Sequence, residues 1–160
     1  MPHPANFSSR LDATDRRILR ALQRNGRLTN AALAEEIGMA PSPCLRRLRA
    51  LEEDGVIAGY RALIDRRRLG HGVEAYALVK LAQSDPDWRT RLIEQLQAFD
   101  EVISCQAMTG ECDLLVHIVA SDIEAYGEFA MQRLLTLPGV ADMRSSFVLA
   151  TIKPDRGWPI

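Results

Sequence analysis

The segment around residues 42–49 carries side chains that are suited to binding nucleic acid. Arg46, Arg47 and Arg49 lie within four residues of one another, shortly after Ser42. A guanidinium group can pair bidentately with guanine O6 and N7, or it can clamp a backbone phosphate. In a helix, at about 100° per residue, Ser42, Arg46 and Arg49 share one side. We predict DNA contacts for these three. Arg47, at the boundary of that side, would contact a phosphate or, alternatively, a carboxylate within the domain.

Three short amphipathic helices would have to position these arginines. The first begins at Asp12, which can cap it, and the charge of Asp15 is favourable in its first turn. It ends at Asn25-Gly26. The second is capped by Thr29 and ends at Gly38. A helix pair joined by such a tight turn is typical of a helix-turn-helix, whose last helix leaves a polar face free to enter the major groove.

The third helix carries the arginines and begins within residues 40–43, where proline is tolerated because first-turn N–H groups lack partners. The positions predicted to face inward in the three helices are Ile18, Leu19, Leu22, Leu33, Ala34, Ile37, Cys44, Leu45, Leu48 and Leu51. The alternative for the arginine-rich face is a solvated surface that residues 52–54, all acidic, neutralise.

The charge is divided unevenly along the chain. Residues 1–72 hold 13 arginines, no lysine and eight acidic residues, a net charge of +5, whereas residues 73–160 carry a net charge of −6. This division favours two domains, of which only the first would bind a polyanion, although chance clustering of surface charge would look the same. We expect a DNA-binding domain over residues 1–60, a linker over 61–72 and a second domain over 73–160.

The second domain shows the alternation of strands and the periodicity of amphipathic helices in turn. Strands are expected over residues 73–81, 102–109, 114–120 and 140–152, with helices starting at 84–86 and at Asp122. The helix residues expected to face inward are Trp88, Leu92, Ile93, Leu96, Phe99, Ile123, Tyr126, Ala130, Leu134 and Leu137. The order βαββαβ is that of a ferredoxin-like unit, so the whole chain is expected to be an α+β protein.

Such a unit has helices on one face of its sheet only. We expect the other face to be rich in Ala, Val and Leu and to be covered by a second subunit, because an apolar sheet face left in water favours aggregation. A two-fold dimer also suits a helix-turn-helix protein, since it presents two recognition helices to two half-sites.

Several protein classes are disfavoured by the composition. No apolar run approaches the roughly 20 residues of a membrane span, and the first ten residues lack the apolar core of a signal peptide. The three cysteines have no CxxC spacing and indicate reduced thiols in the cytoplasm. We expect no metal, no cofactor and no enzymatic activity, since no catalytic motif is present and the three histidines, at 3, 71 and 117, are scattered.

The chain resembles the Lrp/AsnC family of bacterial and archaeal transcription regulators from Leu11 to Lys153. The segments that carry the resemblance are LDATDRRIL, GRLTNAALAEEIG, PSPCLRRLRALEEDGVIAGYRALID, TGECDLLV and LPGVADMRSSFVLATIK. The resemblance implies a winged or plain helix-turn-helix followed by a ligand-sensing αβ domain. It also implies dimers that assemble into tetramers or octamers, and a small effector, usually an amino acid, that binds between subunits and changes assembly or DNA affinity.

The family's effector loop, Gly-x-x-Asp, matches Gly110 and Asp113, with Glu111 and Cys112 between them. Further positions that line family pockets are Ala107, Ile123, Ser146, Phe147 and Val148. Asp113 can accept hydrogen bonds from an ammonium group, and backbone N–H groups of the Gly110 turn can face a carboxylate. The alternative is an ordinary hairpin turn whose aspartate caps its own backbone.

The chain departs from the family pattern at three positions. Cys112 stands where the family often has Tyr or Thr, and Ser146 stands where Tyr is frequent, so the identity of the effector is open. Ala40 replaces the usual Ser before the third helix. Two rival functions remain. One is an enzyme on the same scaffold, as in sirohaem decarboxylases, because a fold does not fix a function. The other is an architectural protein that binds DNA with little sequence preference.

Overall fold

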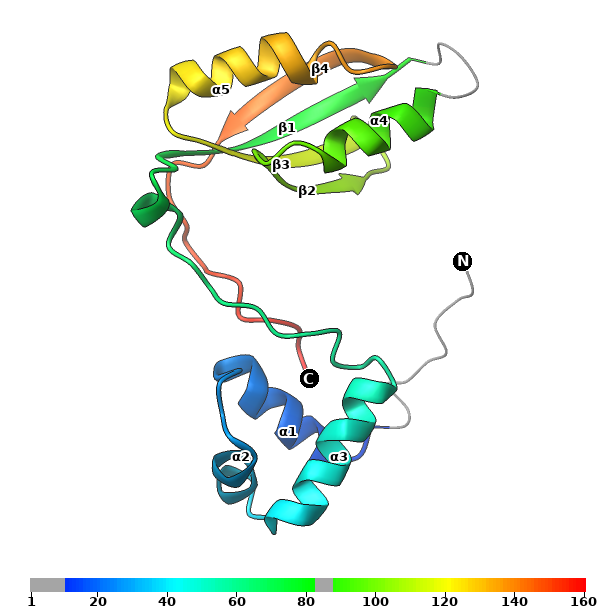
Figure 1. The fold of residues 1–160 in the computed structure, drawn as a ribbon. Helices are drawn as coiled ribbons and strands as arrows, with labels where there is room; N and C mark the ends of the chain where they lie inside the picture. Colours follow the sequence, from blue (N-terminus) through cyan, green and yellow to red (C-terminus); the bar gives the residue numbers. More distant parts are fainter. Residues whose placement is uncertain (1–10, 83–87) are drawn as a thin grey trace. The chain divides into compact units, whose positions relative to one another are not determined.

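The computed structural model describes residues 11–82 and 88–160 of the chain. It divides into two compact units (Figure 1). The first runs to Leu63 and also includes Lys153–Ile160, and the second is Ile64–Ile152. The second domain was expected to extend through Ile160, so the structure differs at the carboxyl end, where the last eight residues pack with the amino-terminal helices.

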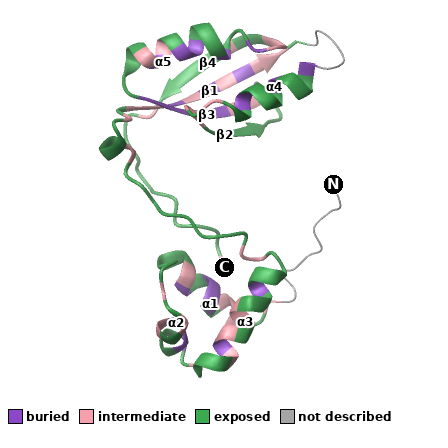
Figure 2. Cartoon of the chain, in the orientation of Figure 1, coloured by how far each residue is buried: buried purple, intermediate pink, exposed green. Residues whose placement is uncertain are grey.

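The first unit contains the three expected helices, α1 (Ala13–Arg24), α2 (Asn30–Glu36) and α3 (Pro41–Glu53). Their inner faces form one apolar core, and Figure 2 shows that the buried positions lie on the sides facing the other helices. The buried residues are Ile18, Leu19, Ala21, Leu33, Ala34, Ile37, Cys44 and Leu51. Apart from Ala21, all were predicted from helical spacing. Leu45 is half-buried and does not belong to this core.

The caps of these helices follow the predicted chemistry. The Asp12 carboxylate accepts hydrogen bonds from the backbone N–H groups of Thr14 and Asp15, at 2.7 and 2.8 Å. The Asp12 N–H in turn donates to the Asp15 carboxylate, which completes a capping box. Thr29 caps α2 through the N–H of Ala32 at 3.2 Å. Ala40, at the same position of α3, provides no side-chain cap. The start of α3 therefore has weaker local support than the starts of α1 and α2.

The carboxyl-terminal segment packs on α1. The Arg20 guanidinium donates to the carbonyl of Ile160, 2.7 Å from Nε, and the Gln23 amide donates to the carbonyl of Trp158 at 3.1 Å. The side chain of Ile160 adds to the apolar core of the unit. Gly157 has a φ of 86°, and a Cβ there would lie 1.8 Å from Gln23 Oε1, so this turn requires glycine.

The second unit has the predicted βαββαβ order. Its strands and helices are β1 (Val73–Leu81), α4 (Trp88–Gln97), β2 (Val102–Ala107), β3 (Leu114–Ala120), α5 (Ile123–Phe129, continued by a wider turn over Ala130–Leu134) and β4 (Val140–Phe147). The four strands form one antiparallel sheet in the order β2-β3-β1-β4. Both helices lie on the same face of this sheet (Figure 1) and enclose the main core with β1 and β3.

The uncovered face of the sheet is not the Ala- and Val-rich surface that was expected. The register places Ala75, Ala77 and Val79 on the face that the helices cover, where all three are buried. Small residues lie there because they let the helices approach the sheet closely. The opposite face mixes polar side chains with a few apolar ones, two of them leucines, and consists of Glu74, Tyr76, Leu78, Lys80, Ser104, Gln106, Leu115, His117, Val119, Asp142, Arg144 and Ser146.

A polar cluster lies on this open face. Glu74 contacts His117 Nε2 at 2.8 Å and the Arg66 guanidinium at 2.9 Å, and the ring of Tyr76 stacks on His117 with centroids 4.6 Å apart. Arg66 belongs to a short 3₁₀ helix, Arg66–Leu69, which is part of the same unit as the sheet.

Other differences from the predicted elements are local. The last strand ends at Phe147, not at residue 152. Ile93 and Ile123 were placed inward but are 49% and 60% exposed, because the helices turn other residues toward the sheet. The predicted helix start at 84–86 lies outside the described residues.

Candidate DNA-binding surface and effector site

The outward face of α3 carries Ser42, Arg46 and Arg49, all exposed as predicted. Cys44 and Leu51 anchor the opposite face in the core, and burial raises the pKa of the Cys44 thiol, so this cysteine serves packing. Within residues 11–82 and 88–160, neither Arg46 nor Arg49 makes an ion pair or a hydrogen bond through its side chain. Two unpaired guanidinium groups on one helix face are available to a polyanion without breaking any contact of the domain.

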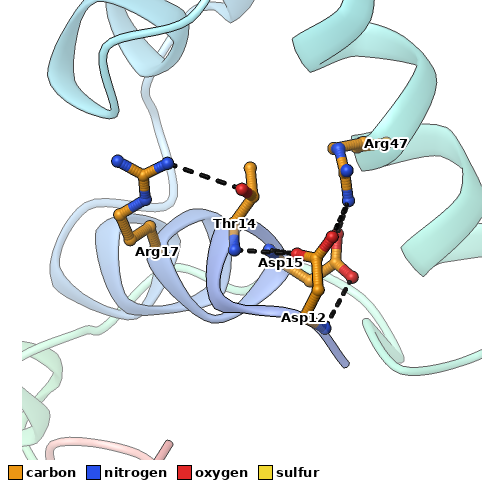
Figure 3. Close-up of polar contacts among 5 residues, drawn as sticks. All are labelled: Asp12, Thr14, Asp15, Arg17 and Arg47. Atoms are coloured by element: carbon orange, nitrogen blue, oxygen red, sulfur yellow. Dashed lines mark hydrogen bonds and ion pairs between the residues drawn. The ribbon is translucent and has the colours of Figure 1, made fainter. Parts of the chain in front are cut away.

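Arg47 lies differently from the other two arginines. Its Nη1 donates to Asp12 Oδ2 at 2.7 Å and to Asp15 Oδ1 at 2.8 Å, so it joins α3 to the start of α1 (Figure 3). Two kinds of partner were predicted for Arg47, a phosphate or a carboxylate within the domain. In the structure Arg47 binds two carboxylates of its own domain. The predicted DNA contact of Arg47 would require breaking these pairs.

Charge effects at this junction reinforce the pairing. The N–H of Asp15 and then the Arg47 guanidinium hold the pKa of the Asp12 carboxyl below its usual value. The hydrogen bonds to Asp15 and Asp12 raise the pKa of Arg47. Asp12 and Arg47 are therefore both charged at neutral pH. Near the end of α3, the Glu52 carboxylate accepts a hydrogen bond from the Tyr60 hydroxyl at 2.8 Å. Burial and then this carboxylate raise the pKa of Tyr60 to about 12.

The predicted effector loop joins β2 to β3 at one end of the sheet. Asp113 Oδ2 accepts a hydrogen bond from the N–H of Leu81 at 2.8 Å, and the Asp113 N–H donates to the carbonyl of Val79 at 2.9 Å. The aspartate thus closes β1 where its pairing with β4 becomes irregular. This role is similar to the predicted alternative, an aspartate that caps its own hairpin turn, except that Asp113 bonds to the backbone of the neighbouring strand β1. Within the described residues, Oδ1 of Asp113 makes no hydrogen bond.

The other residues of this loop differ in exposure. Gly110 has a φ of 105°, which favours glycine, and its carbonyl accepts from Lys80 Nζ at 3.4 Å. Glu111 is exposed and Cys112 is buried. An apolar groove of about 830 Å³ opens beside the loop, between α4 and β2, and two of the predicted effector residues, Ala107 and Asp113, line it. The loop therefore combines a carboxylate, a lysine and an apolar surface.

The remaining predicted effector residues lie at the opposite end of the sheet. Phe147 pairs with Ala75, and the Val148 N–H donates to the Glu74 carbonyl at 2.9 Å, whereas the loop is bonded to Val79 and Leu81. The Leu81 contact lies six residues along β1 from the Ala75 contact, or about 20 Å. Ser146 faces the open side, and Ile123 begins α5 at the same end as Phe147. One chain therefore does not bring the nine predicted residues together.

Sequence reasoning missed three partners of the predicted sites. Asp12 and Asp15 were interpreted as helix-start residues only, although their spacing, three residues apart, is the signal of a capping box whose free oxygens can bind an arginine. Lys80 was counted as a strand residue, and nothing in its local pattern indicated that it reaches the Gly110 loop.

Two kinds of feature are absent from the described residues. No group of three His, Cys, Asp or Glu side chains is placed to hold a metal ion. None of the helices there has the length and hydropathy that a membrane crossing requires.

Two protein-family models match the chain, and together they span both units. The model of the winged helix-turn-helix DNA-binding domain matches residues 11–58. The model of the Lrp/AsnC ligand binding domain matches residues 74–158. The boundary between the matched ranges agrees with the division between the three-helix unit and the sheet, but the second range also includes residues 153–158, which pack with the three-helix unit. The described residues between α3 and β1 contain no strand that would form a wing.

Individual proteins are similar over nearly the whole chain. The DNA-binding transcriptional activator DecR of Escherichia coli is 35% identical over 150 residues, which are 94% of this chain and 99% of DecR. The Bkd operon transcriptional regulator of Pseudomonas aeruginosa is 38% identical over 142 residues, 89% of this chain and 93% of that protein. A crystal structure of a Neisseria meningitidis transcriptional regulator with L-methionine superposes with a TM-score of 0.89, at 41% identity, covering 93% of this chain and 96% of that one.

Proposed function

The chain belongs to the Lrp/AsnC family of DNA-binding transcription regulators, and on that basis we propose that Arg46 and Arg49 read base edges from the major groove. The observation that carries the proposal is the exposed face of α3, where both guanidinium groups are unpaired within the described residues and Ser42 precedes them. Arg47 is left out of this surface because Asp12 and Asp15 already bind it.

The test is competition between a selected and a random duplex. Wild-type protein selects its preferred sites from a random-sequence library, and its affinity for the best duplex is compared with that for unselected DNA at physiological salt. A regulator that reads bases prefers its site by roughly 10³-fold or more. Equal affinities would favour the architectural alternative. Salt dependence alone does not separate the two functions, since phosphate contacts weaken with salt in both.

The sensing unit is proposed to bind an amino acid between two subunits. Loop residues of one chain (Ala107, Gly110, Glu111, Cys112, Asp113) and strand-end residues of another (Ile123, Ser146, Phe147, Val148) would form one pocket. The separation of about 20 Å between the two sets within a chain supports this arrangement. The free Oδ1 of Asp113 would accept from the ammonium group, and the apolar groove beside Ala107 would receive an apolar side chain such as that of methionine.

Mixing two variants tests the shared pocket. Asp113→Asn keeps an oxygen for the Leu81 N–H but removes the charge, and Phe147→Ala removes a wall at the other end. Each variant alone should lose the rise in melting temperature that L-methionine or L-leucine gives the wild type, since only a ligand of the native state stabilises it. After subunit exchange, half of the pockets in mixed dimers are intact, so part of the response should return. No return would place the pocket within one chain.

The open face of the sheet is proposed to pair with a second copy, and such dimers to assemble into tetramers or octamers. Leu78 and Leu115 lie opposite each other there, next to Arg144 and the Glu74–His117 pair. A surface that mixes leucines with opposite charges suits a self-complementary contact. Leu115→Asp should shift the wild-type assembly toward monomers in sedimentation velocity, and an unchanged assembly would contradict the proposed face.

We further propose that the protein is not an enzyme and that it acts on the nucleoid in the cytoplasm of a bacterium or archaeon. The support is that its relatives are transcription regulators. A sirohaem decarboxylase would purify with a coloured tetrapyrrole, so a colourless preparation that binds DNA with sequence preference favours the regulator over the enzyme.

A further inference from the structure

The two ion pairs of Arg47 hold the recognition helix at its middle. Both carboxylates that receive Arg47 are themselves fixed, because each uses its other oxygen in the capping box of α1. Figure 3 shows the guanidinium directed at this pair of side chains. We propose that Arg47 is a positioning residue that sets the rotation of α3 and thereby aims Arg46 and Arg49 at the bases. The inference rests on the proposed reading of bases by these two arginines.

The apolar core alone does not fix that rotation tightly. Apolar contacts are non-directional, and the inner side of α3 contributes Cys44 and Leu51 as buried side chains and Leu48 as a partly buried one. The helix also lacks a side-chain cap at Ala40. Directional contacts are hydrogen-bonded ones. Among the described residues, α3 has three such contacts to residues outside the helix: the Asn30 amide donates to the Pro41 carbonyl at 2.9 Å, Glu52 near the end of the helix accepts from the Tyr60 hydroxyl at 2.8 Å, and Arg47 pairs with the start of α1.

Position along the helix makes Arg47 the tether that matters for recognition. Arg46 is its direct neighbour and Arg49 follows two residues later, so a small rotation at Arg47 displaces both outward guanidinium groups. Bidentate pairing with guanine tolerates little displacement. The Arg47 side chain is 37% exposed, and ion pairs as exposed as this contribute little to folding stability. Loss of the pair should therefore affect sequence selectivity more than it affects stability.

Four full-length variants test the inference on two probes, the duplex selected by the wild type and a random duplex. Arg47→Met keeps the side-chain stem but removes the charge. Asp15→Asn removes the charge and keeps one of the two acceptor oxygens. We expect either to lower affinity for the selected duplex roughly tenfold and affinity for the random duplex at most about twofold. Combining them should cost no more than one alone, as for residues of a single contact. Arg46→Ala, run in parallel, reports on base reading itself.

Salt dependence provides the readout that separates positioning from direct contact. If Arg47 only positions α3, the slope of log affinity against log salt stays at its wild-type value in Arg47→Met. A slope lower by about 0.9, with equal losses on both duplexes, would show that Arg47 binds a phosphate and overturn the inference. The inference is also overturned if Arg47→Met keeps the wild-type ratio of affinity for the selected duplex to affinity for the random duplex, while Arg46→Ala lowers that ratio. A wild type that selects no sequence overturns the reading of bases itself. Should Arg47→Met fail to fold, Asp15→Asn gives the same comparison.

Discussion

The two units of this protein place their proposed functional residues in opposite ways. In the three-helix unit, the residues that would contact DNA lie on one exposed face of one helix, within eight positions of the sequence. In the sheet unit, the residues that would bind an effector lie at two ends of the sheet, about 20 Å apart. A rigid surface for a long polymer can be built from one element, whereas a pocket for a small molecule needs walls from several. A second subunit is the natural source of the missing walls.

The units also differ in how much apolar core supports them. Among the described residues, the sheet unit buries 14 hydrophobic residues in its core and the three-helix unit buries eight. Leu33 and Leu134, one in each unit, are both fully buried. Replacing either by alanine should cost about 2–5 kcal/mol. Because the smaller core buries fewer apolar side chains, it gives its unit less folding stability to lose. Leu33→Ala should therefore unfold the three-helix unit and abolish DNA binding, whereas Leu134→Ala should leave the sheet folded.

Hydrogen exchange resolved by segment is the measurement for this pair. It reports protection of α1–α3 and of β1–β4 separately in each variant. If Leu33→Ala leaves the helices as protected as those of the wild type, the comparison of the two cores is mistaken.

Recognition of DNA should depend on single arginines of α3. Arg46→Ala should cost about 1–3 kcal/mol at the selected duplex and relax sequence preference at one position, if the side chain reads a base. Fluorescence anisotropy on the selected duplex and its single-base variants checks this. Arg89→Ala on α4 is the matched control, because it removes an arginine from the sheet unit. An equal loss on every sequence would show that Arg46 holds a phosphate instead.

The carboxyl-terminal segment should stabilise the three-helix unit alone. At Gly157, whose φ is 86°, alanine should cost about 1–2 kcal/mol through backbone strain, in addition to its contact with Gln23. Urea unfolding followed separately in the two units measures this. Gly70→Ala, with the same φ but with open space around it, is the control for strain without collision. Equal losses from both variants would mean that packing against Gln23 contributes nothing.

Helix caps offer a smaller and reversible test within the DNA-binding unit. Thr29→Ala removes the cap of α2 and should cost about 1 kcal/mol, and Ala40→Ser, which gives α3 a cap, should gain a similar amount. Thermal unfolding of both variants measures the two effects. A lower folding stability in Ala40→Ser than in the wild type would contradict this expectation and would mean that the start of α3 has no room for a hydroxyl.

Acid should affect the junction of α1 and α3 before it affects the apolar cores. The pKa of Asp12 is lowered in the folded state, so its contribution to stability is present above the unfolded value of 3.8 and is lost as the pH falls through the folded value. We expect a small additional loss of stability below pH 3.8, absent in Asp12→Asn. Urea midpoints between pH 6 and pH 3 measure it, and parallel curves for the two proteins would contradict the assigned contacts.

Local chemistry explains which parts of this structure were predictable. The cap at Asp12, the cap at Thr29 and the stripe that includes Leu33 follow from residues at most four positions apart, and all three agree with the structure. The face of β1 was predicted less well, since alternation separates two faces without saying which one the helices cover. Ala75 and Ala77 proved to face the helices.

Long-range contacts explain what was missed. The docking of Ile160 on α1 joins residues 140 positions apart, and the pairing of Arg47 joins it to Asp12 across 35 positions. Each uses ordinary polar groups that have many possible partners in the sequence. Their choice depends on the packed arrangement of helices, which spacing alone does not specify.

The most direct test of the central claim compares one ratio in two proteins. The affinity for the selected duplex is divided by that for random DNA at physiological salt, in the wild type and in Arg46→Ala/Arg49→Ala. The account predicts a wild-type ratio of roughly 10³ or more that falls close to one in the variant, with the fold intact. A ratio that survives the loss of both arginines would contradict it, because some other surface would then be reading the sequence.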